Sequence, residues 1–135
     1  FGASLEGERP GESLYDIATR AADPERVIFS EYHAVGAVSG AYMVRKGRWK
    51  LIHYHDFAPE LFDLDSDPEE TTNRATDPEC ADVLADLYEA LNMICDPAAM
   101  NDLAFADQDA MIAGYGGPEH AMHMGAPAAT PPPET

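Results

Sequence analysis

The chain has 135 residues, of which 45% are apolar, and its 25 acidic residues against eight basic ones give a formal net charge of −17. Its length and apolar fraction suit one domain with a core of its own, and no apolar run approaches the roughly 20 residues of a membrane span. The negative charge argues against nucleic acids and anionic membranes as partners.

The first 25 residues are rich in glycine, proline and glutamate, and they include a short helical candidate from Ser13 to Arg20. We interpret residues 1–25 as a linker. The first strand is expected from about Arg26 to His33, where β-branched and aromatic residues are dense. Residues 34–40 contain two glycines and no charge, so they are expected to form a loop.

Three more strands follow in quick succession. They are expected at Ala41–Arg45, Trp49–His55 and Glu60–Leu64, with a turn at Lys46-Gly47. The short connections favour antiparallel pairing. Apolar side chains alternate onto both faces of the third strand, which predicts a sheet covered on both sides.

A helix is expected from about Asp77 to Cys95, because apolar residues recur there at helical spacing. Its start signals are a capping box of Thr76 with Glu79 and the Asp77-Pro78 pair. The two cysteines, Cys80 and Cys95, lie near opposite ends of this helix, too far apart for a disulfide bond.

A second helix is expected from Pro97 to about Ala113, ended by Gly114 and the glycines after it. Residues 114–135 have no periodic pattern and are expected to be extended or disordered. The fold class is therefore α+β, with a four-stranded antiparallel sheet packed against a long helix, and the subdomain spans residues 26–113. Seven residues are expected to be largely buried: Trp49, Leu51, Leu61, Val83, Leu84, Leu87 and Leu91.

Several clusters have the composition of a binding site. The acidic run that begins Asp63-x-Asp65-x-Asp67 resembles the start of a calcium loop, but Pro68 and Arg74 stand where glycine and glutamate are required, so we interpret it as a solvated turn. Four of the eight basic residues fall between 45 and 50, and we interpret them as the exposed rim of a hairpin.

Two histidine pairs could in principle bind zinc. His53 and His55 share one face of a strand, but no third ligand is evident, and we interpret them as ordinary sheet residues. His120 and His123 would share a face only in a helix, which the neighbouring glycines and prolines disfavour. No metal site is predicted.

The stretch Glu60–Asn73, ELFDLDSDPEETTN, closely resembles the LFDL-x-x-DP-x-E-x-x-N signature near the C-terminal end of sulfatases, which belong to the alkaline-phosphatase superfamily. Residues 27–33 are similar to the "vfsEyh" strand of that family and residues 41–52 to its "mir-x-g-x-yKyi" hairpin. Residues 2–5 resemble its "G-x-SL" segment, and 116–119 and 130–133 resemble the tail of some bacterial members.

The resemblance implies a C-terminal segment of a bacterial formylglycine-type sulfatase, whose missing N-terminal catalytic domain would be its partner. It implies formylglycine and a divalent cation, calcium being favoured, in the parent enzyme. Neither Cys80 nor Cys95 fits the C-x-P-x-R motif that yields formylglycine, so no catalytic residue is expected in this segment. The resemblance also implies a homo-oligomer contact through the tail.

The resemblance places the end of the first strand and the loop 34–40 toward the catalytic domain. Tyr32 and His33 are therefore the candidate residues of the substrate-pocket rim, where His33 would donate to a sulfate or leaving-group oxygen. A structural histidine at a domain seam is the alternative.

Two functions remain open from the sequence. The chain is either a subdomain of a sulfatase, inactive alone, or an autonomous acidic interaction module without catalysis. The substrate, the distinction between a sulfatase and a phosphonate or phosphate ester hydrolase, and the compartment (cytoplasm or periplasm) are not decided.

Overall fold

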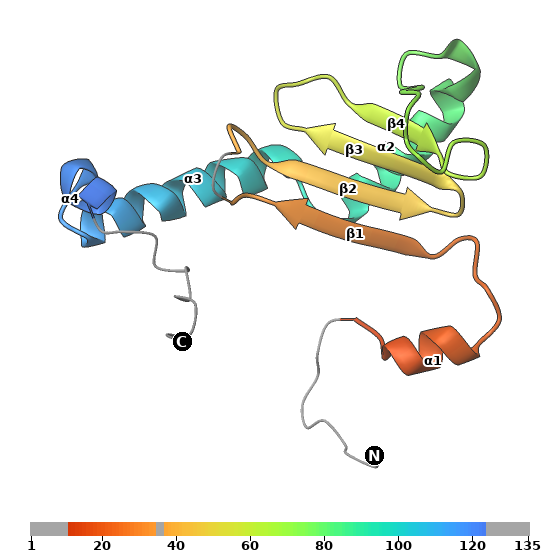
Figure 1. Cartoon of the computed structure of the whole chain (residues 1–135), viewed down its shortest axis with the longest axis horizontal. Coiled ribbons are helices and arrows are strands. Elements are labelled where there is room, and N and C mark those ends of the chain that lie inside the picture. The colour runs from red at the N-terminus through yellow and green to blue at the C-terminus, as the bar shows by residue number, and fades with distance from the viewer. Residues whose placement is uncertain (1–10, 35–36, 124–135) are drawn as a thin grey trace, which may run out of the picture.

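The computed structural model describes residues 11–34 and 37–123. It is an α+β fold in which four antiparallel strands lie in the order β1-β2-β3-β4 and α2 crosses one face of the sheet (Figure 1). The elements are α1 (Leu14–Thr19), β1 (Val27–Tyr32), β2 (Ala41–Lys46), β3 (Trp49–Tyr54), β4 (Glu60–Asp63), η1 (Pro78–Cys80), α2 (Ala81–Ile94), α3 (Pro97–Gly114) and α4 (Pro118–His123).

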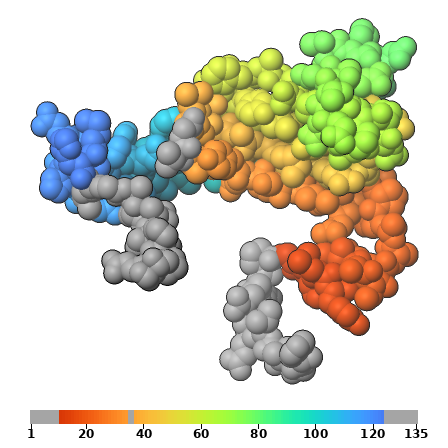
Figure 2. All heavy atoms as spheres, in the orientation of Figure 1, coloured from red at the N-terminus to blue at the C-terminus, as the bar shows by residue number. Residues whose placement is uncertain are grey.

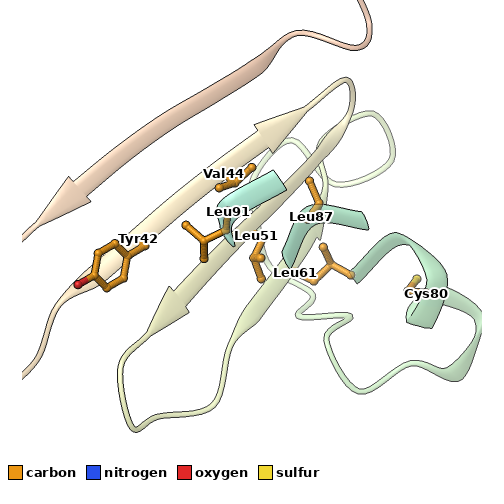
Figure 3. Packing of buried hydrophobic residues seen from close by; sticks show 7 residues of the cluster. All are labelled: Tyr42, Val44, Leu51, Leu61, Cys80, Leu87 and Leu91. Carbon is orange, nitrogen blue, oxygen red and sulfur yellow. The ribbon is translucent and has the colours of Figure 1, made fainter. Parts of the chain in front are cut away.

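The strand register decides which side chains meet the helix. Val44 of β2 lies opposite Leu51 of β3, and Leu51 lies opposite Leu61 of β4, so these three share one face. Leu87 and Leu91 of α2 pack onto them, and all five are at most 1% exposed (Figure 3). The predicted sheet, the long helix and this part of the core are confirmed.

Three residues predicted to be buried are only half-buried. Trp49 lies at the end of β3, and Val83 and Leu84 lie on the flanks of the stripe that α2 turns toward the sheet. The helix start also differs in detail, because the Asp77 side chain, rather than a capping box with Thr76, accepts a hydrogen bond from the Glu79 amide at 2.9 Å.

The expectation that helices or other elements cover both faces of the sheet is wrong for the described residues. On the face opposite α2, Ile28 is 39% and Tyr32 is 52% exposed, and Met43, Ile52 and Tyr54 are half-buried. Among the described residues of that face, only Phe62, at 6% exposed, is buried. An open apolar face therefore remains.

The expectation of an extended tail is wrong for its described part. Gly116 and Gly117 adopt positive φ and end α3, and Pro118 then begins the short helix α4. Residues 124–135 lie outside the described residues. Figure 2 shows α3 and α4 projecting from the body of the domain as an arm. None of the described helices is long and apolar enough to span a membrane.

Candidate functional site

The two predicted rim residues lie at the end of β1 and just beyond it. Tyr32 is the last residue of the strand, and the half-buried His33 follows it. The His33 ring packs edge-to-face on Tyr42, with ring centres 5.4 Å apart, and its Nε2 lies 3.4 Å from Glu31 Oε2. The two residues are thus brought to one end of the sheet, where His33 is held from two sides.

A row of four rings runs from this point to the helix. Tyr42 stacks on His53 at 6.0 Å, and His53 meets Tyr88 of α2 edge-on at 5.6 Å, with its Nδ1 3.3 Å from the Tyr88 hydroxyl. Tyr42 is fully buried, and its hydroxyl donates to the Pro97 carbonyl at 2.8 Å. In the sequence these residues fall in three expected strands and a helix, and no pattern reveals the row, because only the strand register and the packing of α2 align them.

Gly40 allows this arrangement. A methyl group on its Cα would lie 2.6 Å from the Tyr42 hydroxyl and 2.9 Å from His33 Cε1, which is closer than such atoms approach. Its amide donates to the buried Asn101 side chain at 2.9 Å, which ties the loop to α3. Glycine is therefore required here by close packing.

The space beside His33 is small. The cavity between the end of the loop and α3 measures about 10 Å³, the scale of a single water molecule. Its lining consists of His33, Ala37, Ser39, Gly40, Asn101, Ala104, Phe105 and Gln108. The described residues therefore enclose no substrate-sized pocket beside His33.

The pKa values of three groups in or beside the ring row are shifted toward the neutral form. Burial raises the pKa of Tyr42 to about 12, and burial together with His55 lowers the pKa of His53. Burial, Glu31 and Asp96 raise the pKa of the Cys95 thiol. A protonated thiol is a poor nucleophile and a poor metal ligand, so Cys95 has the environment of a structural residue.

The described residues contain no group of three His, Cys, Asp or Glu side chains placed to hold a metal ion. His53 belongs to the ring row, and His55 Nε2 lies 3.5 Å from Asp56. The segment 63–67 is not a fully solvated turn as expected, because Asp63 is 3% exposed and pairs with Arg48 at 3.3 Å.

The 60–73 motif is a structural clamp, by which we mean a set of polar side chains that hold a loop in place through hydrogen bonds and an ion pair. The Asp67 carboxylate accepts from the amides of Thr71 and Thr72, and Glu70 pairs with Lys50 at 2.6 Å. The Asn73 side chain accepts from the amides of Leu61 and Ala75 and donates to the Pro59 carbonyl. These polar residues hold a loop against β4.

Comparisons with known proteins agree on one domain. The family model described as N-sulphoglucosamine sulphohydrolase, C-terminal, matches residues 7–97. Arylsulfatase K of mouse is 39% identical over 87 residues, covering 56% of this chain and 16% of the mouse protein, and the human protein is 49% identical over 51 residues, covering 36% and 10%. A solved 2-O GAG sulfatase superposes with a TM-score of 0.58 at 29% identity, over 69% of this chain and 21% of that one.

The matched part has clear limits. The chain spans no more than about a fifth of the length of these three proteins. The family match includes all four strands and α2, and it ends at Pro97, where α3 begins. The arm of α3 and α4 therefore begins where the family match ends.

Proposed function

The chain belongs to the N-sulphoglucosamine sulphohydrolase C-terminal family, and on this premise we propose that it works as the C-terminal subdomain of a longer sulfuric ester hydrolase. The observation that carries the proposal is a match that runs continuously through the sheet and helix α2. The relatives reported above carry sulfatase names, which favours sulfate esters over phosphonates or phosphates as the parent's substrates. A bacterial source stays a prediction, since the curated relatives are animal proteins.

In this proposal the segment contributes position rather than chemistry. Tyr32 and His33 form part of the pocket rim, with the His33 imidazole donating to an oxygen of the sulfate or of the leaving group. Three features support this role: the packing against Tyr42, the carboxylate of Glu31 and the space kept by Gly40. Together they fix the ring of a half-buried histidine at the end of a strand.

The formylglycine nucleophile and the divalent cation, for which calcium is our choice, belong in this proposal to the rest of the parent chain. The residues described here do not fit either group, because they contain no cluster of metal ligands and Cys80 and Cys95 lack the C-x-P-x-R context. The segment alone therefore performs no catalytic step.

The partner in this proposal is the parent's N-terminal catalytic domain. The open face of the sheet suits it, since Ile28, Met43, Ile52 and Tyr54 share that face without a helix across it in the described part of the chain. Residues 1–25 then act as the linker and 26–113 as the subdomain. Burying an apolar face against the rest of the same polypeptide is the usual way to stabilise a small domain.

A homo-oligomer contact through the C-terminal tail, residues 114–135, is the second part of the partner proposal. In the described part of this tail, Tyr115 is 46% and Met122 is 77% exposed. Exposed methionine and aromatic side chains suit an adaptable interface. Sedimentation of the full-length protein with and without residues 114–135 tests this, and an unchanged mass after truncation contradicts it.

The decisive experiment begins with the coding sequence upstream of Phe1. An in-frame C-x-P-x-R motif allows the full-length protein to be made and assayed with aryl sulfates and with phosphonate monoesters. We expect hydrolysis of the sulfates. If the upstream sequence lacks the motif and the full-length protein is inactive, the autonomous acidic module is the better reading.

The rim role has its own test in the full-length protein. His33→Ala should lower kcat/KM for a sulfate ester by about 10-fold or more, the scale of one hydrogen bond to a charged group. His123→Ala, an exposed histidine on α4, is the matched control and should leave kcat/KM unchanged. An unchanged kcat/KM in His33→Ala would leave only the structural role at the domain seam.

A further inference from the structure

The two edge strands of the sheet differ in how their outer backbone groups are paired. On the β4 edge, the Leu61 amide donates to the Asn73 side chain at 3.0 Å, and the Leu61 carbonyl accepts from the Arg74 amide at 2.8 Å. The opposite edge strand, β1, is paired only with β2 among the described strands. One edge is therefore closed by the chain itself and the other is available for pairing.

The sequence of β1 carries little of the usual protection of an edge strand. It reads VIFSEY, with six residues that all pair with β2, one charged side chain (Glu31) near its end, and no lysine, proline or bulge. Edge strands of isolated proteins are commonly blunted by such features, because unpaired amides and carbonyls recruit other strands. A weakly protected edge of this length indicates that another segment normally pairs with it.

A groove lies directly beside this edge. Helix α2 packs over β2 and β3, so its C-terminal end and the start of β1 leave a hollow of about 500 Å³ between them. Val27 is 38% exposed, Ile94 45% and Met93 83%. A strand added to β1 would place every second side chain over these apolar groups.

The mostly negative charge around the groove favours a basic occupant. Glu25, Asp86 and Glu89 line it together with one cation, Lys46. Lys46 Nζ already bridges Glu25 at 3.2 Å and Asp86 at 3.0 Å. The remaining negative charge near Glu89 favours a segment that carries lysine or arginine, and it disfavours a second copy of this acidic chain.

We propose that the outer edge of β1 and the Val27–Ile94 groove bind an extended, alternately apolar and basic segment as a fifth strand of the sheet. The segment comes from the remainder of the same polypeptide, which in related proteins is several times longer than this chain. The inference rests on the proposed function, because it takes the chain to be one domain of a longer sulfatase. Backbone pairing supplies the affinity, and the groove supplies the choice of side chains.

The test is residue-resolved hydrogen exchange at residues 27–31, in the full-length protein and in the 135-residue chain. We expect the β1 amides that point away from β2 to exchange at least 10-fold more slowly in the full-length protein. The Leu87 and Leu91 amides serve as the internal reference for an intact core. Fast exchange of these β1 amides in both proteins overturns the proposal, and so does protection in the short chain that disappears on dilution, which would reveal self-association.

A variant pair tests the charge preference within the full-length protein and does not depend on the short chain folding. Glu89→Lys should speed exchange of the same β1 amides by about threefold or more. Glu69→Lys, an equal charge change at an exposed residue of the 60–73 loop, should leave it unchanged. Equal effects of the two variants overturn the charge argument. Aryl sulfate hydrolysis is measured separately. If the β1 amides are protected but the full-length protein is inactive, the proposed function is refuted and the fifth-strand proposal stands.

Discussion

Tyr42 is the residue on which the candidate site depends most. Its ring lies between the imidazoles of His33 and His53, and its hydroxyl reaches the first residue of α3. It therefore links the end of β1, the centre of the sheet and the base of the arm.

Gly40→Ala should disturb the candidate site directly. The new methyl group would meet the Tyr42 hydroxyl and His33 Cε1 at under 3 Å, so one ring must move. We expect a loss of about 1–3 kcal/mol in the free energy of unfolding, measured by urea denaturation. Gly114→Ala, where nothing lies within 4 Å, is the control and should cost nothing measurable. Equal stabilities of the two variants would show that the loop adjusts freely.

The pKa of Tyr42, raised to about 12 by burial, makes stability depend on alkaline pH. Below pH 10 the tyrosine is protonated in both folded and unfolded chains, and its contribution is fully present. As pH rises from 10 through about 12, the unfolded chain releases this proton first, and up to about 2–3 kcal/mol is lost.

The measurement is the free energy of unfolding at pH 10 and pH 12. Wild-type protein should lose more stability over this interval than Tyr42→Phe, in which the group cannot ionise. Tyr115→Phe, at an exposed position, should keep the wild-type loss. The same loss in Tyr42→Phe and wild type would contradict the assignment.

Leu87 tests the core between α2 and the sheet. It is 1% exposed and packs with the buried leucines of β3 and β4, so Leu87→Ala should cost about 2–5 kcal/mol. Met93→Ala on the same helix, where the side chain is 83% exposed, should change the free energy of unfolding by less than about 0.5 kcal/mol. Comparable losses in the two variants would place the core elsewhere.

At the scale of elements, the 60–73 loop explains why a recognisable motif need not be an active site. The side chains of Asp67 and Asn73 accept hydrogen bonds from backbone amides, and Glu70 pairs with Lys50. The loop in turn closes the β4 edge, which leaves β1 as the edge open to pairing. In the fifth-strand proposal, the motif therefore helps to fix which edge of the sheet receives another segment.

Asn73→Ala should weaken this closure. The Leu61 and Ala75 amides and the Pro59 carbonyl would lose their side-chain partner, and we expect a cost of about 1–3 kcal/mol. Faster exchange of the Leu61 amide should accompany it. Asn92→Ala, on the exposed side of α2, is the matched control and should have little effect. A stable Asn73→Ala variant with a protected Leu61 amide would refute the clamp.

At the scale of the whole molecule, the domain has a packed core on the face of the sheet that α2 covers. Apolar side chains remain exposed elsewhere on its surface. The open face, the open β1 edge and the projecting arm are separate surfaces, and each presents apolar groups to solvent. This distribution is typical of a part that is stable in a larger assembly, and it fits a chain that spans a small share of its relatives.

The isolated chain should not hydrolyse aryl sulfates, because nothing in the described residues provides a nucleophile or a metal site. The measurement is release of the phenol from an aryl sulfate by purified protein. Turnover that persists in a His33→Ala, His53→Ala double variant would show a catalytic set in the segment and contradict the proposed function.

The sequence by itself determined the elements and their order. Strand and helix periodicity are local properties, so the four strands, the α2 stripe and the cap-then-proline entry at Asp77-Pro78 could be read without a structure. The family also followed from sequence, since its signature is a contiguous run of residues. The sequence did not predict the helix at residues 118–123. In a sequence, the glycines that end α3 cannot be told apart from glycines that prevent a further helix from forming.

Only the tertiary structure decided which residues the strand register brings together and which edge of the sheet is covered. The ring row from His33 to Tyr88 joins residues up to 55 positions apart, and one step of strand slippage would separate them. Burial of Asp63, the closed β4 edge and the open face likewise follow from which segments fold back onto the sheet. Such contacts are long-range, and their free energy is decided by the whole packed molecule rather than by any stretch of the chain.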